Sequence, residues 1–324
     1  MKAIVRTKYG PPNVLRLEEV EKPVPNDNEV LVKIYSASVN ALDWHLLEGK
    51  PFLARMGSGL LGPKQNILRA DIAGRVEEVG RRIVQFHPGD EVFGGAHWGF
   101  AEYACAREDR LALKPTNVTF EESAAVPVAA ITALQALRKG RVESGHRVLI
   151  NGASGGVGTF AVQLAKSFGA EVTAVTSTKN MDSARSMGAD HVIDYTREDF
   201  TKTRARYDLI LGVNGYHSIL GYRRALCPKG TYVFVGGSRL MTQFLQSTLL
   251  APLISRIGGK KMSSMGVAKL NQEDLALLKG LLESGQIRPV IDGRYSLSET
   301  PEAIRYLEAG HARGKVVITV AQDN

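Results

Sequence analysis

The first third of the chain contains short stretches in which apolar and polar residues alternate or β-branched residues cluster, separated by glycine and proline. A period of about two residues, bounded by turn residues, is typical of β-strands. Turn segments such as Gly10-Pro11-Pro12 keep these strands short. A series of short strands and glycine turns predicts an irregular β-barrel. The expected strands lie at 1–7, 29–39, 71–80, 88–94 and 100–106.

From about residue 121 the pattern changes to apolar strands that alternate with helical segments. The segment 120–140 is rich in alanine and predicts a helix, and the strand expected at 146–152 leads through a glycine cluster into a helix that stops at Gly169. Apolar strands alternating with helices predict a parallel sheet covered on both faces. Further strands are expected at 171–177, 191–195, 207–213, 231–237 and 315–320, and further helices at 180–189, 271–285 and 298–312.

The composition excludes several classes of protein. With 324 residues, 44% of them hydrophobic and 23% charged, the chain is globular rather than disordered or collagen-like. Its length favours two domains and suffices for a core without disulfides. Two cysteines, Cys105 and Cys227, cannot form a disulfide framework or a four-cysteine zinc site. We find no signal-like leader and no apolar run of about 18 residues, so we expect a soluble, cytoplasmic protein.

The net charge of +8 raises the question of nucleic-acid binding. A nucleic-acid interface needs clustered basic residues. Here they are scattered beside acidic residues, and the densest places, Arg81-Arg82 and Lys260-Lys261, are only pairs. We therefore expect no nucleic-acid partner, and attraction of an anionic small molecule explains the charge better.

The glycine cluster at 151–158 lies between a predicted strand and a predicted helix, where such a pattern indicates a dinucleotide site. Gly152 allows a tight turn, and Gly158 allows the helix to pack closely on the strand. Between them, Gly155 and Gly156 carry no side chain where a pyrophosphate must approach the backbone, and the helix N-terminus attracts its charge. A glycine-rich turn without a ligand would need fewer glycines. The predicted cofactor-binding residues of this loop are Gly152, Ser154, Gly155, Gly156, Val157 and Gly158.

The end of the following strand, at 174–180, distinguishes the two nicotinamide dinucleotides. NAD sites usually carry an acidic residue there, about 20 residues after the loop, which holds the ribose 2′-hydroxyl. This segment has no carboxylate, but it offers the hydroxyl of Ser177 and the ammonium of Lys179, which would bind a 2′-phosphate. The sequence therefore predicts NADPH. The alternative for Lys179 is a solvated loop lysine.

Seven segments in this order resemble one known family. They are Asn40-Ala41-Leu42-Asp43, ADIAGRVEEVG at 70–80, GDEVFG at 89–94, AAITALQAL at 129–137, NGASGGVG at 151–158, SMGADHVIDY at 186–195 and GHARGKVVI at 310–318. Over essentially its whole length the chain is similar to the zinc-independent quinone oxidoreductases of the medium-chain dehydrogenase/reductase superfamily. Within that family it resembles the alkenal and enone reductases, including the chloroplast-envelope and reticulon-interacting types.

The resemblance implies the α/β architecture of that family. A GroES-like irregular β-barrel domain would comprise residues 1–122 and 266–324, and a doubly wound Rossmann domain that binds NADPH would comprise 123–265. The active site would lie in the cleft between them. A homodimer would form through the edges of the Rossmann sheets, for which 262–268 is the candidate edge strand.

The chain departs from the zinc-dependent relatives at two places. Those enzymes carry a metal-binding cysteine where this chain has 40–43, and a Gly-His-Glu run where it has Ala70-Asp71-Ile72. A catalytic zinc needs about three protein ligands. Although His45, His87 and His97 are imaginable ligands, we expect no metal.

The resemblance also implies site residues. Asn40 and Asp43 would line the nicotinamide end of the cleft. Many relatives have tyrosine at the position of His45. His45 would contact the ribose or the substrate oxygen and relay a proton. Alternatively, His45 only packs on Trp44. Asp71 would accept from a cofactor amide or, as we expect, fix the Ala70–Gly74 turn. Further cofactor-binding residues would be Thr132, Tyr195, Val235, Gly236 and Lys315.

The function implied is hydride transfer from NADPH to a quinone or an α,β-unsaturated carbonyl substrate, with donors that stabilise charge on oxygen. Two alternatives are a reductase of enoyl thioesters, which would need a basic entry for the carrier's nucleotide, and a non-catalytic NADPH-binding protein that binds a partner, membrane or RNA.

The apolar segment 240–257 is expected to be a lid over an apolar substrate; a dimer contact or a membrane-surface helix are the alternatives.

Overall fold

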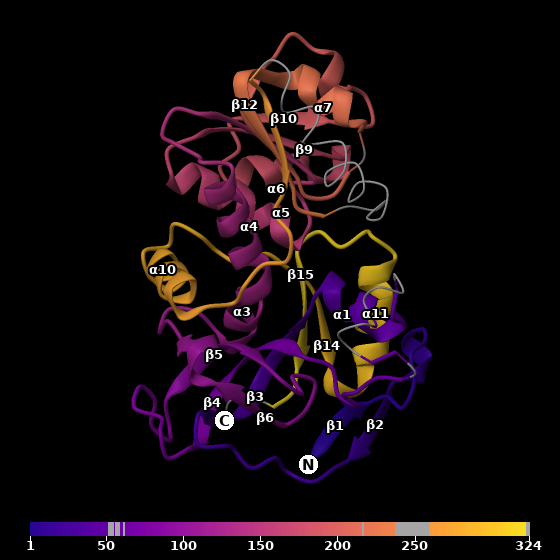
Figure 1. Ribbon diagram of the computed structural model, residues 1–324, viewed down its shortest axis with the longest axis vertical. Helices are drawn as coiled ribbons and strands as arrows, with labels where there is room; N and C mark the ends of the chain where they lie inside the picture. Colours follow the sequence, from indigo (N-terminus) through magenta and orange to yellow (C-terminus); the bar gives the residue numbers. More distant parts are fainter. Residues whose placement is uncertain (51–54, 56–58, 61, 216, 237–258, 322–324) are drawn as a thin grey trace. The chain divides into compact units, whose positions relative to one another are not determined.

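The chain folds into two compact units in the computed structural model, which describes all residues except 51–54, 56–58, 61, 216, 237–258 and 322–324 (Figure 1). The first unit contains residues 1–129, 270–285 and 289–324, and the second contains 130–269 and 286–288. The boundaries thus fall at 129/130 and 269/270, where the sequence placed them at 122/123 and 265/266. The first unit combines both ends of the chain, coloured indigo and yellow in Figure 1.

The first unit is built on a seven-stranded sheet with the order β14-β15-β3-β4-β5-β7, in which β6 also pairs with β3. The long strand β3 pairs with β15 through 36–39 and with β6 through 29–33, and it pairs with β4 along most of its length. Two register shifts between β3 and β4 bend the sheet, as expected for the predicted irregular barrel. The strands are β3 Glu29–Val39, β4 Ala70–Val79, β5 Glu91–Ala96, β6 Tyr103–Arg107, β7 Leu111–Leu113, β14 Ile291–Ser296 and β15 Lys315–Thr319, with a separate pair β1 Lys2–Val5 and β2 Arg16–Glu19.

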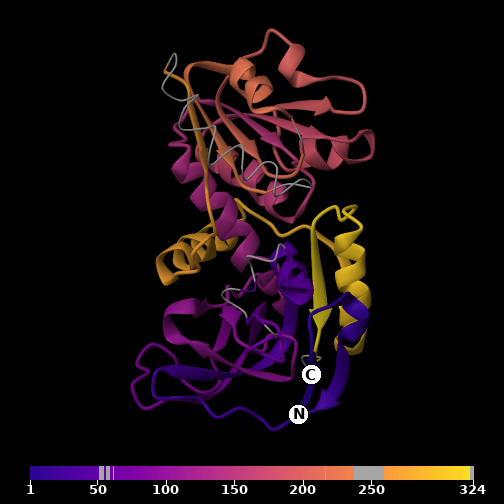
Figure 2. The same ribbon diagram turned by 45° about the vertical axis from the view of Figure 1, so that its right-hand side comes forward.

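The helices of the first unit close its core. Helix α11 (Thr300–Glu308) packs along β14, and α1 (Ala41–Glu48) lies beside α11 in both views (Figures 1 and 2). The core beneath them is almost wholly aliphatic and includes residues of β3, β4, β5 and β15. The remaining helices are α3 Phe120–Ala124 and α10 Gln272–Glu283.

The second unit contains the predicted parallel sheet, with the order β10-β9-β8-β11-β12-β13. From β8 the chain first adds strands on one side, β9 and β10, and then on the other, β11 to β13. Because crossovers between parallel strands are right-handed, this change of side places α5 and α6 on one face of the sheet and α7 on the other. The elements of this unit, in chain order, are β8 Arg147–Asn151, α5 Gly156–Ser167, β9 Glu171–Thr176, α6 Met181–Ser186, β10 His191–Asp194, β11 Tyr207–Gly212, α7 Ile219–Ala225, β12 Leu226–Phe234 and β13 Lys261–Ser264.

Two expectations change in detail. The helix expected over 120–140 is divided into α3 and α4 (Pro127–Lys139), because Pro127 has no N–H to continue α3 but suits the first turn of α4. The edge strand expected at 262–268 is β13, at one end of the sheet. Both cysteines are free.

In the described part of the chain, no helix is both long and apolar enough to cross a membrane. The segment 240–257, for which a lid was expected, lies outside the described residues.

Candidate active site

The predicted phosphate-binding loop leaves β8 and opens α5. Gly152 adopts a φ of +95°, and the N–H groups of Gly152 and Ala153 donate to the carbonyl of Val175 in β9 at 3.2 and 3.1 Å. Gly155 is the N-cap of α5, and no side chain caps the helix. The first N–H groups of a helix have no acceptor within it. The start of α5 therefore presents N–H groups and the positive end of the helix dipole to an anion.

The space around the loop differs from one glycine to the next. A Cβ at Gly152 would lie 2.4 Å from the carbonyl oxygen of Asn214, and one at Gly158 would lie 2.1 Å from that of Gly152. A Cβ at Gly155 would meet no atom of the described residues within 4 Å. The protein itself therefore does not need glycine at 155, whereas a pyrophosphate lying against the backbone would. The loop fits the phosphates of a dinucleotide.

The loop lies where the strand order of the sheet reverses, between β8 and β11. Asn151 at the end of β8 holds the two strand ends together, since its carbonyl accepts from Val213 and Asn214 N–H at 2.9 and 3.0 Å. Its side-chain Nδ2 donates to the hydroxyl of Tyr222 at 2.9 Å. Ligands of open α/β sheets bind at the carboxyl ends of the strands beside such a reversal.

Two basic side chains follow the ends of β9 and β10. Lys179 is exposed in the turn after β9, and Arg197, whose side chain is 77% exposed, follows β10 by three residues. Arg197 lies 3.6 Å from the carboxylate of Asp194, whose pKa is lowered by hydrogen bonds from the hydroxyls of Thr178 and Thr196. Arg197 was not among the predicted residues, although its position just after a strand end could have indicated it.

The remaining predicted cofactor residues of the second unit lie at or near the same edge, except Thr132. The N–H of Tyr195, which is 61% exposed, donates to Thr176 at 3.0 Å, and Ser177 accepts from the amide of Asn180 at 3.2 Å. Val235 and Gly236 follow β12, and both donate to the carbonyl of Gly212, at 2.9 and 3.2 Å. Thr132 is half-buried on α4. The roles of these residues toward a cofactor stay predictions.

A cavity of about 420 Å³ lies in the first unit. Its buried polar lining includes Asn40, Asp43 and Asp71, which are 9%, 5% and 1% exposed. Most of the remaining wall is apolar. The apolar lining residues are Leu42, Leu46, Ile67, Leu68, Ala70, Ala96, Val128 and Leu270.

Asn40, Asp43, Asp71 and Lys315, which we call the Asn40 cluster, form a buried network. The N–H of Asn40, at the N-terminus of α1, donates to Asp43 Oδ2 at 2.7 Å. The amide of Asn40 donates to Asp71 Oδ2 at 3.0 Å and accepts from the ammonium of Lys315 at 2.6 Å. Lys315 also donates to the carbonyl of Val39 at 3.2 Å and lies 3.8 Å from Asp71 Oδ2.

Asp71 has partners that the sequence did not indicate. Its Oδ2 accepts from the N–H of Val128 at 3.1 Å and the hydroxyl of Ser38 at 3.4 Å, whereas its Oδ1 is buried without a partner among the described residues. The expectation that Asp71 fixes a turn at Ala70–Gly74 is wrong, because these residues belong to strand β4. Asp71 instead joins β3, β4 and the start of α4.

Burial governs the charges of the cluster. Desolvation raises the pKa of Asp43 to about 8, against the hydrogen bond from Asn40, and Asp71 raises it further. Burial likewise raises the pKa of Asp71 and lowers that of Lys315, although their mutual attraction opposes both shifts. Near neutral pH the Asp43 carboxyl therefore keeps its proton.

Replacing Asp43 by Asn is expected to flatten the dependence of stability on pH. Because the pKa of Asp43 rises from 3.8 to about 8 on folding, the folded state binds more protons between these values, and stability falls as pH rises through them. The slope from this one group is at most about 1.4 kcal/mol per pH unit. Urea unfolding at several pH values from about 5 to 8 measures it.

The Asn side chain retains an oxygen that accepts from the Asn40 N–H, so the start of α1 is preserved. The matched control is Asp182→Asn, since the side chain of Asp182 is 99% exposed on α6. An unchanged slope in Asp43→Asn would show that Asp43 ionises normally in the folded protein.

His45 does not line this cavity within the described part of the chain. Its ring stacks on that of Trp44 at a centroid distance of 4.5 Å, and burial lowers its pKa. This is the packing that the sequence analysis weighed against a catalytic role. Proton relay by His45 stays a prediction.

Metal ligation was tested against the described residues. Among them, no three His, Cys, Asp or Glu side chains are grouped so that they could hold a metal ion. Asn40 to Asp43 supply a carboxyl that is already bonded to backbone. The donor set present at this position does not fit a catalytic zinc.

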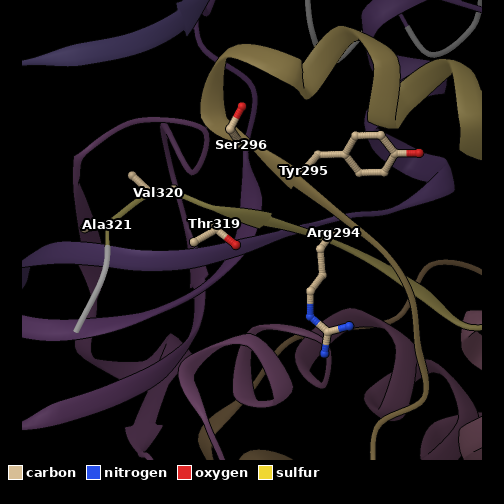
Figure 3. Close-up of a pocket in the computed structure, with 6 residues that line it drawn as sticks. All are labelled: Arg294, Tyr295, Ser296, Thr319, Val320 and Ala321. Atoms are coloured by element: carbon tan, nitrogen blue, oxygen red, sulfur yellow. The ribbon is translucent and has the colours of Figure 1, made fainter. Parts of the chain in front are cut away.

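A second hollow of about 390 Å³ lies at the ends of β14 and β15 (Figure 3). Figure 3 shows that the residues lining it come from these neighbouring strands and the segment that follows β15. Its polar groups are already paired, since Arg294 and Thr319 both bond to Glu121, at 2.7 and 2.8 Å. Glu121 thus joins the two strands to α3, which is a structural role.

Two family models match the chain. The alcohol dehydrogenase GroES-like domain matches residues 26–134, and the zinc-binding dehydrogenase domain matches residues 187–318. The GroES-like match lies mostly in the first unit, whereas the second match spans the later strands of the parallel sheet and the C-terminal part of the first unit.

Curated proteins and solved structures match over nearly the whole chain. It is 36% identical to 2-methylene-furan-3-one reductase from Solanum lycopersicum, covering 98% of this chain and 79% of that protein. It is 33% identical to the chloroplastic NADPH-dependent alkenal/one oxidoreductase of Arabidopsis thaliana, with the same coverage. Among solved structures, the quinone oxidoreductase from Coxiella burnetii has a TM-score of 0.86 at 31% identity and 99% coverage of both chains.

Proposed function

The chain belongs to the quinone and enone reductases of the medium-chain dehydrogenase/reductase superfamily, and from this premise we propose that it reduces quinones or α,β-unsaturated carbonyl compounds with NADPH and without zinc. It is an oxidoreductase that uses a nicotinamide dinucleotide. The choice of NADPH, the absence of a metal and the role of each residue are the parts proposed.

The observation that carries the proposal is the Asn40 cluster. It places an amide, a proton-bearing carboxyl and an unpartnered carboxylate oxygen on the lining of a cavity whose walls are largely apolar. Such a cavity excludes water and accepts an apolar substrate. Burying a polar group in such a wall costs desolvation free energy, and groups of this kind are found mainly where they act on a substrate.

The cofactor supplies a hydride when bound. As the β-carbon of an enone accepts it, negative charge develops on the carbonyl oxygen, and hydrogen-bond donors at that oxygen lower the barrier. We assign this stabilisation to the amide of Asn40 and the carboxyl of Asp43. The proton that completes the reduction at the α-carbon comes from Asp43, which keeps its proton near neutral pH, and water restores it.

A panel of substrates tests this function. NADPH oxidation is measured with a quinone, an alkenal, an enone and an enoyl thioester, together with NADPH binding by fluorescence. The proposal is supported if kcat/KM is higher for the quinone, the alkenal or the enone than for the enoyl thioester. Asp43→Asn should then lower kcat for that substrate by about a hundredfold. Preference for the thioester would support the enoyl reductase alternative. NADPH binding without turnover of any compound would favour a non-catalytic role.

Replacing Lys179 and Arg197 by Gln is expected to weaken NADPH but not NADH. Both side chains are exposed beside the ends of β9 and β10, where the 2′-phosphate would lie. Loss of the two charges should raise the KM for NADPH about tenfold. The control is Lys229→Gln, an exposed lysine near the amino end of β12. Equal effects on both cofactors would contradict the assignment.

We also propose that the protein is a cytoplasmic homodimer. The two free cysteines suit a reducing compartment. Strand β13 is the last strand of the parallel sheet in the described part of the chain, and we propose that a second copy pairs with it there. Analytical ultracentrifugation distinguishes a dimer from a monomer.

A further inference from the structure

Three basic side chains line the cavity of the first unit beside its apolar wall. Lys64 and Arg69 are exposed at its rim, and Arg110 is half-buried. A fourth cation, Arg6, is 3% exposed and donates to the carbonyls of Leu46 and Gln65 at 2.5 and 3.4 Å. The cavity is therefore basic as well as apolar.

Arg69 and Arg110 line the cavity together with Asp71. Asp71 pairs with Gly95 across β4 and β5, and these two residues share one face of the sheet. Arg69 directly precedes β4, and Arg110 directly precedes β7.

Gly95, which pairs with Asp71, carries no side chain, and the side chain of Leu270 fills the space that a Cβ would take there. A Cβ at Gly95 would lie 2.5 Å from a methyl carbon of Leu270.

These cations have no acidic partner in the described part of the chain. No carboxylate there lies within ion-pair distance of Arg6, Lys64, Arg69 or Arg110. Residues 49–70 contain four basic residues and no acidic one. Burial lowers the pKa of Arg69, and the neighbouring charge of Arg110 lowers it further. Within the Asn40 cluster, Asp71 already has an ion-pair partner in Lys315.

We propose that the substrate carries, apart from its reducible double bond, an anionic group that binds between Arg69 and Arg110. This inference rests on the proposed reductase function. The reducible end lies against the Asn40 cluster, the carbon chain lies along the apolar wall, and the anionic group neutralises the two arginines. A carboxylate attached through a short spacer and the phosphates of an acyl carrier share this chemistry.

A matched pair of compounds tests the proposal. A straight-chain enone ending in a carboxylate is compared with its methyl ester, in a short series of increasing spacer length and with an enoyl-coenzyme A thioester as a further arm. The measured quantity is the ratio of kcat/KM for acid and ester, in wild type and in Arg69→Gln/Arg110→Gln. Arg16→Gln, an exposed arginine on β2, is the control.

The wild type is expected to favour the acid by about tenfold or more, and the double variant should lose most of this preference. If the wild type instead prefers the enoyl thioester to the methyl ester and the double variant loses this preference, that result also supports the proposal. It then identifies the carrier's phosphates as the anionic group. Equal rates for acid and ester in wild type, or an unchanged ratio in the variant, overturn it while the reductase function stands. A raised KM for NADPH with an unchanged ratio assigns the arginines to the cofactor and also overturns it.

If neither compound is reduced, the proposed function fails, and binding decides the inference by itself. The saturated keto acid and its methyl ester are then titrated calorimetrically. Tighter binding of the acid that the double variant abolishes supports the anion site, and equal binding of the two overturns it. Thermal unfolding of the variant excludes a folding defect as the cause.

Discussion

Replacing Lys315 by Met is expected to destabilise the protein by about 3–5 kcal/mol, because it removes one partner of a buried ion pair. Lys315 is 3% exposed, and Asp71, which lies 3.8 Å from it, is 1% exposed. The methionine cannot donate to Asn40 or to the carbonyl of Val39. Both acceptors would lose this donor, and the carboxylate of Asp71 would lose its cationic partner while keeping the hydrogen bonds from Asn40 and Val128.

Urea unfolding measures the loss, and a double variant identifies its origin. Removal of the Asp71 charge in Lys315→Met/Asp71→Asn should restore at least about 1 kcal/mol relative to the sum of the single variants. The control is Lys8→Met, since Lys8 is exposed in the same unit. A loss below about 1 kcal/mol in Lys315→Met would contradict a charged, buried Lys315.

Replacing Gly158 by Ala is expected to disrupt the second unit, at a cost of about 3 kcal/mol or more. The added methyl group would lie 2.1 Å from the carbonyl oxygen of Gly152 and 2.8 Å from backbone atoms of Ala153. Neither atom belongs to a flexible side chain. Helix α5 would therefore have to move away from the end of β8. Thermal unfolding measures the effect.

Gly155→Ala separates cofactor binding from folding. A Cβ at 155 meets no described atom within 4 Å and the backbone conformation there suits any residue, so stability should change by less than about 1 kcal/mol. The methyl group would instead meet the pyrophosphate, and we expect NADPH affinity to fall at least about tenfold. Gly280→Ala, on the exposed face of α10, is the control for glycine replacement. Unchanged NADPH affinity in Gly155→Ala would contradict the proposal that the pyrophosphate of NADPH binds at this loop.

Pattern alone located most elements of the parallel sheet. Strands β8, β9 and β11 are almost wholly buried, so their apolar runs stand out from the helices that connect them. Helix α1 was not predicted, because its eight residues have no marked apolar face and follow directly on β3. Helix α7, between β11 and β12, was also missed, since it has only seven residues.

Candidate residues close to motifs were found more easily than those brought together by folding. The glycine loop and Lys179 act through local backbone geometry, which sequence spacing records. Lys315 was expected near the cofactor phosphates on the basis of resemblance. The structure places its ammonium on Asn40, which lies 275 residues away in sequence. No local pattern encodes that contact.

The sequence by itself determined the class of the fold and the glycine loop between β8 and α5, because both depend on neighbouring residues and their period. Only the tertiary structure decided that Asn40, Asp43, Asp71 and Lys315 share one buried network, and that Arg69 and Arg110 line the same cavity as Asp71. These groupings arise from the register of β3, β4, β5, β7 and β15. Strand register is a long-range property, and burial, which sets the charges of these groups, follows from it.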